Sequence, residues 1–146
     1  VENLRMLGSG PLRATGNDLP NTMRGNSADN VIDGAAGDDI LAGGQGSDTL
    51  TGGAGNDRFV LDGQLNGNVD TITDFTSGQD RIVLPVATFG GLSGSWFTTG
   101  EATTATRVFQ KGETMYFDAD GSGKLAEPVA FAKLPPGVQL TVNDFA

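Results

Sequence analysis

Three aspartates recur at nine-residue spacing in the middle of this chain. Asp39, Asp48 and Asp57 hold the sixth place of three units between Gly34 and Val60, which read GAAGDDILA, GGQGSDTLT and GGAGNDRFV. Glycine dominates the first, second and fourth places, where it lets the backbone adopt positive φ and approach a ligand closely. Carboxylates beside converging carbonyl oxygens suit a hard divalent cation, above all calcium. The spacing therefore predicts several calcium ions bound in the turns.

The composition also favours a cation as the partner. The net charge of −9 repels nucleic acid and anionic membrane surfaces, and no apolar run approaches the length of a membrane span. The chain has no cysteine and no histidine, so it lacks thiolates, the usual zinc ligands and the commonest general base. We therefore expect a non-catalytic module without a nucleic-acid partner and without membrane insertion.

The strict period predicts a solenoid that positions these aspartates. Each unit divides into a six-residue turn and a three-residue strand, whose central residue points inward because side chains alternate along a strand. If two units complete one coil, one sheet stacks Met23, Leu41 and Phe59, and the other stacks Ile32 and Leu50. This core is thin, so we expect metal binding and folding to be a single coupled event.

Two degenerate units, GNDLPNTMR and GNSADNVID, precede the regular repeats. Asn17 and Asn26 hold their second places, and we expect them to adopt the left-handed conformation that asparagine tolerates best among non-glycine residues. Asn21 and Asn30 hold the sixth places and offer an oxygen without a charge. We expect these units to bind metal weakly or not at all.

The units Gly43–Thr51 and Gly52–Val60 match the nonapeptide G-G-x-G-x-D-x-U-x. In this the chain resembles the RTX (hemolysin-type) calcium-binding proteins, which include serralysin-like proteases, RTX lipases and alginate epimerases. The resemblance implies an all-β fold: a parallel β-roll (a right-handed β-solenoid) of nonapeptide repeats, capped by a C-terminal β-sandwich-like or hairpin region. In this family a site takes the second-, fourth- and sixth-place residues of one unit and the first-, third- and sixth-place residues of the unit two along.

That family rule implies three calcium sites in the repeats. The first joins Ala35, Gly37 and Asp39 with Gly52, Ala54 and Asp57, and the second joins Asn26, Ala28 and Asn30 with Gly43, Gln45 and Asp48. The third would use Gly44, Gly46 and Asp48 with a partner beyond Val60. The following segment resembles the D-x-I-x-D-F-x-x-G-x-D phrase of RTX proteases and lipases, which makes Asp70, Asp74 and Asp80 candidates for terminal ligands. The alternative for these three is that they are solvated acids at strand edges.

The remainder of the chain reads as capping structure. We expect a strand around Thr71, a strand over Arg81–Leu84, a hairpin of Arg107–Gln110 with Thr114–Phe117, and strands over Val129–Leu134 and Val138–Val142. Trp96 and Phe97 are expected to pack as a cap. Asp118–Gly123 begins like an EF-hand loop, but Val129 stands where that loop needs its glutamate, which favours a tight turn.

The end of the chain, Leu140–Ala146, resembles the uncleaved signal of type I secretion in Gram-negative bacteria. The resemblance therefore implies a partner exporter and a secreted, extracellular or cell-surface location. We expect a monomer that ends a larger exported protein, with residues 1–15 as a cap or preceding coil, 16–66 as the calcium-binding β-roll, and 67–146 as capping strands and secretion signal. The alternative function is a carbohydrate- or surface-binding accessory module of an extracellular enzyme or adhesin.

Overall fold

A computed structural model describes residues 2–90, 97–99, 107–118 and 128–146 of the chain. Trp96 and most of the Asp118–Gly123 turn lie outside these residues, so the expectations for them stand as predictions. No helix in the described ranges is long and apolar enough to cross a membrane.

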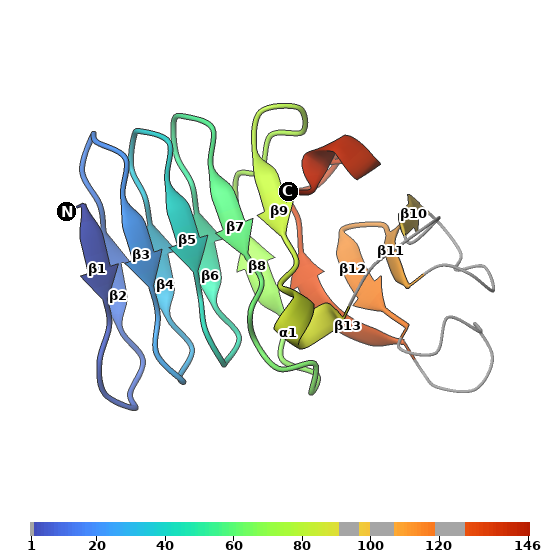
Figure 1. The fold of residues 1–146 in the computed structure, drawn as a ribbon, viewed down its shortest axis with the longest axis horizontal. Helices are drawn as coiled ribbons and strands as arrows, with labels where there is room; N and C mark the ends of the chain where they lie inside the picture. Colours follow the sequence, from blue (N-terminus) through green and yellow to red (C-terminus); the bar gives the residue numbers. More distant parts are fainter. Residues whose placement is uncertain (1, 91–96, 100–106, 119–127) are drawn as a thin grey trace.

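Nine three-residue strands form the first part of the molecule, and they alternate between two sheets (Figure 1). These strands are β1 (Asn3–Arg5), β2 (Arg13–Thr15), β3 (Thr22–Arg24), β4 (Val31–Asp33), β5 (Ile40–Ala42), β6 (Thr49–Thr51), β7 (Arg58–Val60), β8 (Asp70–Ile72) and β9 (Arg81–Val83). Odd-numbered strands form sheet A in the order β1-β3-β5-β7-β9. Even-numbered strands form one end of sheet B, which runs β10-β11-β12-β13-β8-β6-β4-β2. The fold is an all-β parallel β-roll, as predicted.

The eighth-place side chains form the core between the two sheets. Met23 pairs with Leu41 and Leu41 with Phe59 in sheet A, while Ile32 pairs with Leu50 in sheet B. All five are fully buried. The predicted division of these residues between the two sheets is therefore confirmed. Because each side chain lies over its equivalent one coil away, the backbone turns are stacked in the same register.

The roll continues beyond the regular repeats at its C-terminal end. β8 pairs with β6 and β9 pairs with β7, both in parallel, so Ile72 and Ile82 extend the two core stacks. Asp70 and Asp80 follow Asp48 and Asp57 by 22 and 23 residues, whereas regular units one coil apart are separated by 18. The extra residues lengthen the turns before β8 and β9.

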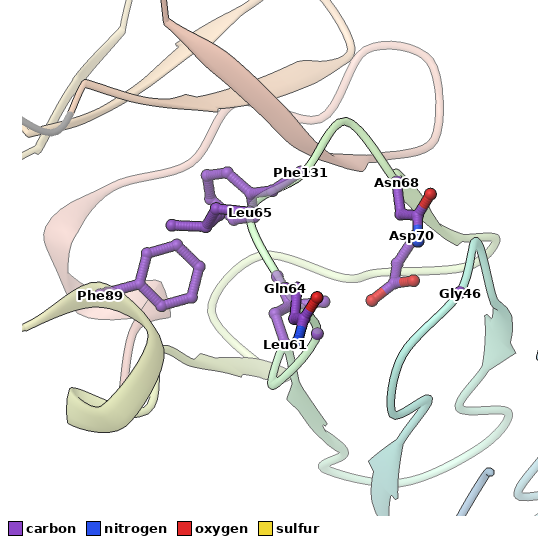
Figure 2. A pocket seen from close by; sticks show the side chains of 9 residues that line it. Gly46, Leu61, Gln64, Leu65, Asn68, Asp70, Phe89 and Phe131 are labelled. Atoms are coloured by element: carbon purple, nitrogen blue, oxygen red, sulfur yellow. The ribbon is translucent and has the colours of Figure 1, made fainter. Parts of the chain in front are cut away.

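The longer turn before β8 joins the roll to the C-terminal part of the chain. Leu65 leaves the roll and packs with Phe89 and Phe131, on the side of the turn away from Asp70 (Figure 2). Phe89 ends α1 (Val86–Phe89), and Phe131 lies in β13 (Val129–Lys133), with their ring centroids 4.9 Å apart. This small aromatic cluster holds the final coil against the capping strands.

The C-terminal strands extend sheet B. β10 (Phe97–Thr99), β11 (Val108–Lys111) and β12 (Thr114–Phe117) precede β13, and β11 and β12 form the predicted antiparallel hairpin. β13 pairs antiparallel with β12 and parallel with β8, so the capping strands and the roll share one sheet.

The predicted strand over Val138–Val142 is wrong. Val138 and Leu140 lie in an irregular segment, which leads to the short 3-10 helix η1 (Val142–Asp144). The buried side chain of Gln110 explains the difference, because its Nε2 donates to the Val138 carbonyl at 2.7 Å and its Oε1 accepts from the Leu140 amide at 2.9 Å. These bonds satisfy backbone groups that would otherwise need a neighbouring strand.

Candidate metal centre

The sixth-place aspartates form ladders along both edges of the roll. The amide of Asp39 donates to Oδ1 of Asp57 at 2.9 Å, and the amide of Asp57 donates to Oδ1 of Asp80 at 3.0 Å. On the other edge, the amide of Asp48 donates to Oδ1 of Asp70 at 2.9 Å. One oxygen of each carboxylate therefore holds the backbone of the preceding coil in place.

The second oxygen of three of these carboxylates has no partner among the described residues. Oδ2 of Asp39, Asp48 and Asp57 is buried and accepts no hydrogen bond from the described residues. An unsatisfied buried acceptor costs about 1–3 kcal/mol, and more when it is charged. Such an atom is suited to a cation, which would both satisfy the oxygen and neutralise the carboxylate.

The first-place glycines keep space beside these oxygens. A Cβ on Gly34 would lie 2.2 Å from Oδ2 of Asp39, and a Cβ on Gly52 would lie 2.3 Å from Oδ2 of Asp57. Gly43 has the same relationship to Asp48, at 2.2 Å. Any side chain at the first place would thus occupy the cradle next to the unpaired oxygen.

The first predicted ligand set comes together on neighbouring turns. The amide of Ala54 donates to the Ala35 carbonyl at 3.0 Å, and the amide of Gly37 donates to the Ala54 carbonyl at 2.8 Å. Gly52 lies beside Oδ2 of Asp57, and Asp57 holds the amide of Asp39. The structure thus brings all six residues into two stacked turns, with carbonyl oxygens next to the carboxylates.

The second predicted set also lies on stacked turns. The amide of Asn30 donates to Oδ1 of Asp48 at 2.7 Å, and glycines of the Asp48 turn lie directly over carbonyl oxygens of the Asn30 turn. A Cβ on Gly44 would lie 2.4 Å from the Asn26 oxygen, and one on Gly46 would lie 2.8 Å from the Ala28 oxygen. Gly43 and Gln45 belong to the same upper turn.

The third predicted set, Gly44, Gly46 and Asp48, needs a second turn beyond Val60. The turn that stacks on it is the one that ends at Asp70. Asp70 is buried and points toward the turn that carries Gly46 (Figure 2). A Cβ on Gly63 would lie 2.9 Å from the Gly44 carbonyl oxygen, so the two turns are in close contact at this point as well.

The terminal acids take different positions. Asp80 occupies the sixth place of the last coil, and its Oδ2 accepts from the Thr76 amide at 2.8 Å. Asp74 instead lies at the start of that turn, where its two oxygens accept from the amides of Gly52 and Gly53 at 2.9 and 2.7 Å. Asp74 therefore holds the first glycines of the preceding coil, whereas Asp80 continues the ladder.

One further pair of stacked turns was not predicted from the sequence. Gly53 and Gly55 stand at the second and fourth places of the unit whose Asp57 faces Asp80, so they complete a fourth set of the same kind. Gln79 contacts this set from the surface, because its Nε2 donates to the Gly55 carbonyl oxygen.

Two repeated tetrapeptides in the sequence are the signal for the pairing of the Asp57 turn with the Asp80 turn. The sequence DTIT at 70–73 repeats DTLT at 48–51, and DRIV at 80–83 repeats DRFV at 57–60. The first pair of tetrapeptides lies in sheet B, at β6 and β8, and the second pair lies in sheet A, at β7 and β9. Each repeated tetrapeptide therefore identifies the strand that continues the same sheet after the nine-residue period ends.

The expectation for Asn17 and Asn26 is wrong. Neither adopts positive φ; among the described non-glycine residues only Ala35 does, at 79°. Instead, Oδ1 of Asn17 accepts from the Leu19 amide at 3.1 Å, and Oδ1 of Asn26 accepts from the Ala28 amide at 2.9 Å. The asparagines build their turns through side-chain hydrogen bonds, which replace the left-handed glycine of the regular units.

Burial strongly affects the carboxyl groups of the ladders. Burial raises the pKa of Asp39 and Asp48, and it raises the pKa of Asp57 to about 6, with the neighbouring charges of Asp80, Asp39 and Asp74 adding to the effect. Burial also raises the pKa of Asp70 to about 7. These ladders thus concentrate negative charge where the protein alone does not stabilise it. A divalent cation supplies the missing stabilisation.

The carboxylates do not form a site without the backbone. Within the described ranges, no group of three or more Asp or Glu residues is placed to hold one metal ion. Calcium takes six to eight oxygens, including backbone carbonyls. Carbonyl oxygens of the stacked turns must therefore provide most of the ligands, which is the reason the glycine pattern matters.

Comparison with known proteins agrees with this geometry. Residues 15–50 and 34–64 match the profile of the RTX calcium-binding nonapeptide repeat. The stacked turns at 15–64 therefore form a calcium-binding RTX repeat module, and this repeat is a non-catalytic type of domain. A comparison with curated proteins gave no match.

A solved structure extends the similarity to nearly the whole chain. The chain is similar to the solution structure of the AlgE6R3 subunit from the mannuronan C5-epimerase of Azotobacter vinelandii, with 27% identity and a TM-score of 0.61. The similarity covers 96% of this chain and 80% of that one. Both the roll and its capping strands therefore resemble an R-module of an epimerase.

Proposed function

We propose that this chain is a module that folds on binding calcium after export and carries the C-terminal type I secretion signal of a larger secreted protein. The observation that supports calcium-coupled folding is the set of three buried carboxylate oxygens, on Asp39, Asp48 and Asp57, that have no partner in the described part of the chain. Without a cation these oxygens oppose folding, because they leave water without gaining a partner.

The residues proposed to hold calcium lie on turns that stack one coil apart. One set is Ala35, Gly37 and Asp39 with Gly52, Ala54 and Asp57, and the next is Gly44, Gly46 and Asp48 with the Asp70 turn. A last set is Gly53, Gly55 and Asp57 with the Asp80 turn. Calcium, when bound, would neutralise these carboxylates and be coordinated by the carbonyl oxygens. The chain's own contribution is to hold the oxygens in register.

Two resemblances support the secretion part of the proposal: that of the repeats to RTX repeats, and that of the last residues to a secretion signal. RTX repeats occur in secreted proteins of Gram-negative bacteria, and Leu140–Ala146 resembles their C-terminal signal. In the low calcium of the cytosol the chain stays unfolded as a monomer and passes through a type I exporter. Outside the cell, at the cell surface or beyond, millimolar calcium folds it.

Circular dichroism with a calcium titration tests the folding step. We expect a disordered spectrum in chelator and a β spectrum at millimolar calcium, with magnesium at the same concentration much less effective because it requires a smaller, stricter ligand shell. A β spectrum that is unchanged by chelator would refute the coupling.

Export tests the second step. A reporter fused in front of this chain should appear in the medium of cells that carry a type I exporter for RTX proteins. The same fusion without Leu140–Ala146 should remain inside. Equal export of both fusions would show that the signal lies elsewhere.

A second candidate function is binding of an anionic polysaccharide of the mannuronan type. Sheet A favours it, because its five strands carry Arg5, Arg58 and Arg81 and no acidic residue, in a chain whose net charge is −9. A fourth arginine of this sheet, Arg24, is paired with Asp62. Arg58 and Arg81 are paired in register on adjacent strands. The similar R-module belongs to an enzyme whose name gives mannuronan as its substrate.

A polymer pull-down in the presence of calcium tests this second function. Mannuronan should retain the chain at low salt, and the double variant Arg58→Ser with Arg81→Ser should be retained less. Arg13→Ser, on the opposite sheet, is the matched control. Retention that does not depend on the sheet A arginines would exclude this face.

A further inference from the structure

The side-chain amide of Asn21 occupies the centre of the first pair of stacked turns. Its Nδ2 donates to the Leu19 carbonyl and lies 3.2 Å from the Asn17 carbonyl oxygen. The same nitrogen lies 3.1 Å from Oδ1 of Asp39 and 3.5 Å from the Gly34 carbonyl oxygen on the turn above. These four oxygens belong to the second and fourth places of one unit and the first and sixth places of the unit two along, the places proposed for the calcium ligands.

The nitrogen stands where a regular unit has its unpaired carboxylate oxygen. A Cβ on Gly16 would lie 2.8 Å from Nδ2 of Asn21, just as a Cβ on Gly34 would lie close to Oδ2 of Asp39. The orientation of the amide follows from its neighbours. Leu19 and Asp39 both present oxygens that only accept, so the atom between them must be the donor.

Asn30 repeats this arrangement on the other edge of the roll. Its Nδ2 donates to the Ala28 carbonyl and lies 3.1 Å from Oδ1 of Asp48 on the turn above. A Cβ on Gly25 would lie 2.8 Å from the same nitrogen. Both asparagines are almost fully buried, so water does not compete for these contacts.

We propose that the amide groups of Asn21 and Asn30 take the place of a bound cation and close the first two pairs of stacked turns without metal. An N–H group presents a partial positive charge to carbonyl and carboxylate oxygens, so it performs the electrostatic part of the cation's role without the ion. This proposal rests on the proposed calcium binding. The proposal also removes calcium from the second predicted site. There the Asn30 amide lies between the two turns that carry Asn26, Ala28 and Asn30 and Gly43, Gln45 and Asp48.

The consequence is a roll with two kinds of coil. The N-terminal pairs of turns are held by amides, and the later pairs, at Asp39, Asp48 and Asp57, retain unpaired carboxylate oxygens that require calcium. Oδ1 of Asn21 and of Asn30 is also buried without a donor among the described residues, but these amide oxygens carry no charge for a cation to neutralise. Gln79 does not change this division, because it contacts only the Gly55 carbonyl and leaves Oδ2 of Asp57 without a donor. Among the described residues three calcium positions remain, one for each unpaired aspartate oxygen.

Counting bound ions by native mass spectrometry and calcium titration calorimetry tests the proposal. At saturation, wild type should bind one calcium ion for each of the three unpaired aspartate oxygens in the described part of the chain. Asn21→Asp and Asn30→Asp should each bind one more ion, because the new carboxylate replaces a donor by an acceptor. Both variants should also need more calcium to reach half of the folded circular dichroism signal. Asn143→Asp is the matched control: it makes the same chemical change at an exposed asparagine outside the roll, so the ion count should equal that of wild type.

The reverse exchange gives an independent reading. Asp48→Asn should bind one ion fewer and should retain more β signal in chelator than wild type, since the new amide can donate to the Gly46 carbonyl. Loss of an ion in Asn30→Ala, or an unchanged ion count in Asn30→Asp, would overturn the proposal while calcium binding itself stands. A wild-type chain that binds no calcium would instead refute the proposed function.

Discussion

Ser77 and Asp144 are 67 residues apart in the sequence, yet the Ser77 hydroxyl donates to both carboxylate oxygens of Asp144, at 2.9 and 3.0 Å. The Gly78 amide donates to the same carboxylate at 2.8 Å, and the Thr141 amide does so at 2.7 Å. Asp144 is almost fully buried. The end of the chain is thereby fixed to the turn that precedes β9.

This contact places the last residues on the open edge of sheet A. Ile82 forms a parallel bridge with Phe145, and the Ala146 amide donates to the Ile82 carbonyl at 2.9 Å (Figure 1). Unpaired strand edges are prone to association with other chains. The C-terminal residues therefore cover the edge at which the roll would otherwise end.

Replacing Asp144 should destabilise the calcium-loaded fold. Asp144→Ala removes the acceptor for the Ser77 hydroxyl, the Gly78 amide, and the amide and hydroxyl of Thr141. It leaves both amides without this partner, at a cost of about 2–4 kcal/mol. Thermal unfolding at saturating calcium measures the loss. The control is Asn143→Ala, since that neighbouring side chain is exposed. An equal melting temperature for Asp144→Ala and Asn143→Ala would show that the contact does not stabilise the fold.

Without metal, the chain should gain structure as the pH falls. Burial raises the pKa of Asp57 to about 6 and that of Asp70 to about 7, from an ordinary value of 3.8. The folded chain then holds protons that the unfolded chain has released, so folding is favoured as pH is lowered through 7 toward about 4. In chelator, the β signal should be larger at pH 5 than at pH 8.

The variant Asp70→Asn provides the control for this pH effect. Its side chain stays uncharged, so the difference in β signal between pH 5 and pH 8 should shrink. Asp144 acts in the opposite direction at lower pH: burial would raise its pKa, but hydrogen bonds from Thr141, Gly78 and Ser77 outweigh burial and lower it. A metal-free signal that grows with rising pH between 5 and 8 would contradict the prediction.

The repeat fold and the main ligand turns could be predicted because their signal is local. Nine residues encode one turn and one strand, so Leu41 and Phe59 identify their sheet, and Asp39 and Asp57 identify their turns, without knowledge of the rest of the chain. The continuation to Asp80 was harder to detect. Its unit is lengthened, and a search in a nine-residue frame ends at Val60.

Other features depend on contacts that no local pattern contains. The segment at Val138 has the alternation of a strand, but the Gln110 side chain from the distant hairpin takes its hydrogen bonds. The roles of Asn17 and Asn21 depend on which atoms face them. Propensity alone suggested a left-handed Asn17, whereas its side chain caps the turn and Asn21 turns its amide toward the carbonyl oxygens.

Ala35 offers a way to stabilise the first calcium turn. It holds the second place with φ of 79°, where Gly44 and Gly53 stand in the regular units with φ of 95° and 96°. A non-glycine residue in this conformation costs about 1–2 kcal/mol, which a glycine would not. Part of the stability gained by Ala35→Gly is offset because glycine has greater conformational freedom in the unfolded chain. Ala35→Gly should therefore raise the free energy of unfolding by about 1 kcal/mol at saturating calcium, measured by urea denaturation.

Two further variants make this prediction specific to backbone conformation. Ala36→Gly makes the same change one residue later, where φ is not positive, and should lower the free energy of unfolding by about 0.5–1 kcal/mol. Gly53→Ala should be worse, at roughly 2–4 kcal/mol, because the new Cβ would lie 1.9 Å from the Ala35 carbonyl oxygen as well as requiring positive φ. If Ala35→Gly and Ala36→Gly change stability in the same direction, left-handed strain at Ala35 is not what distinguishes this turn.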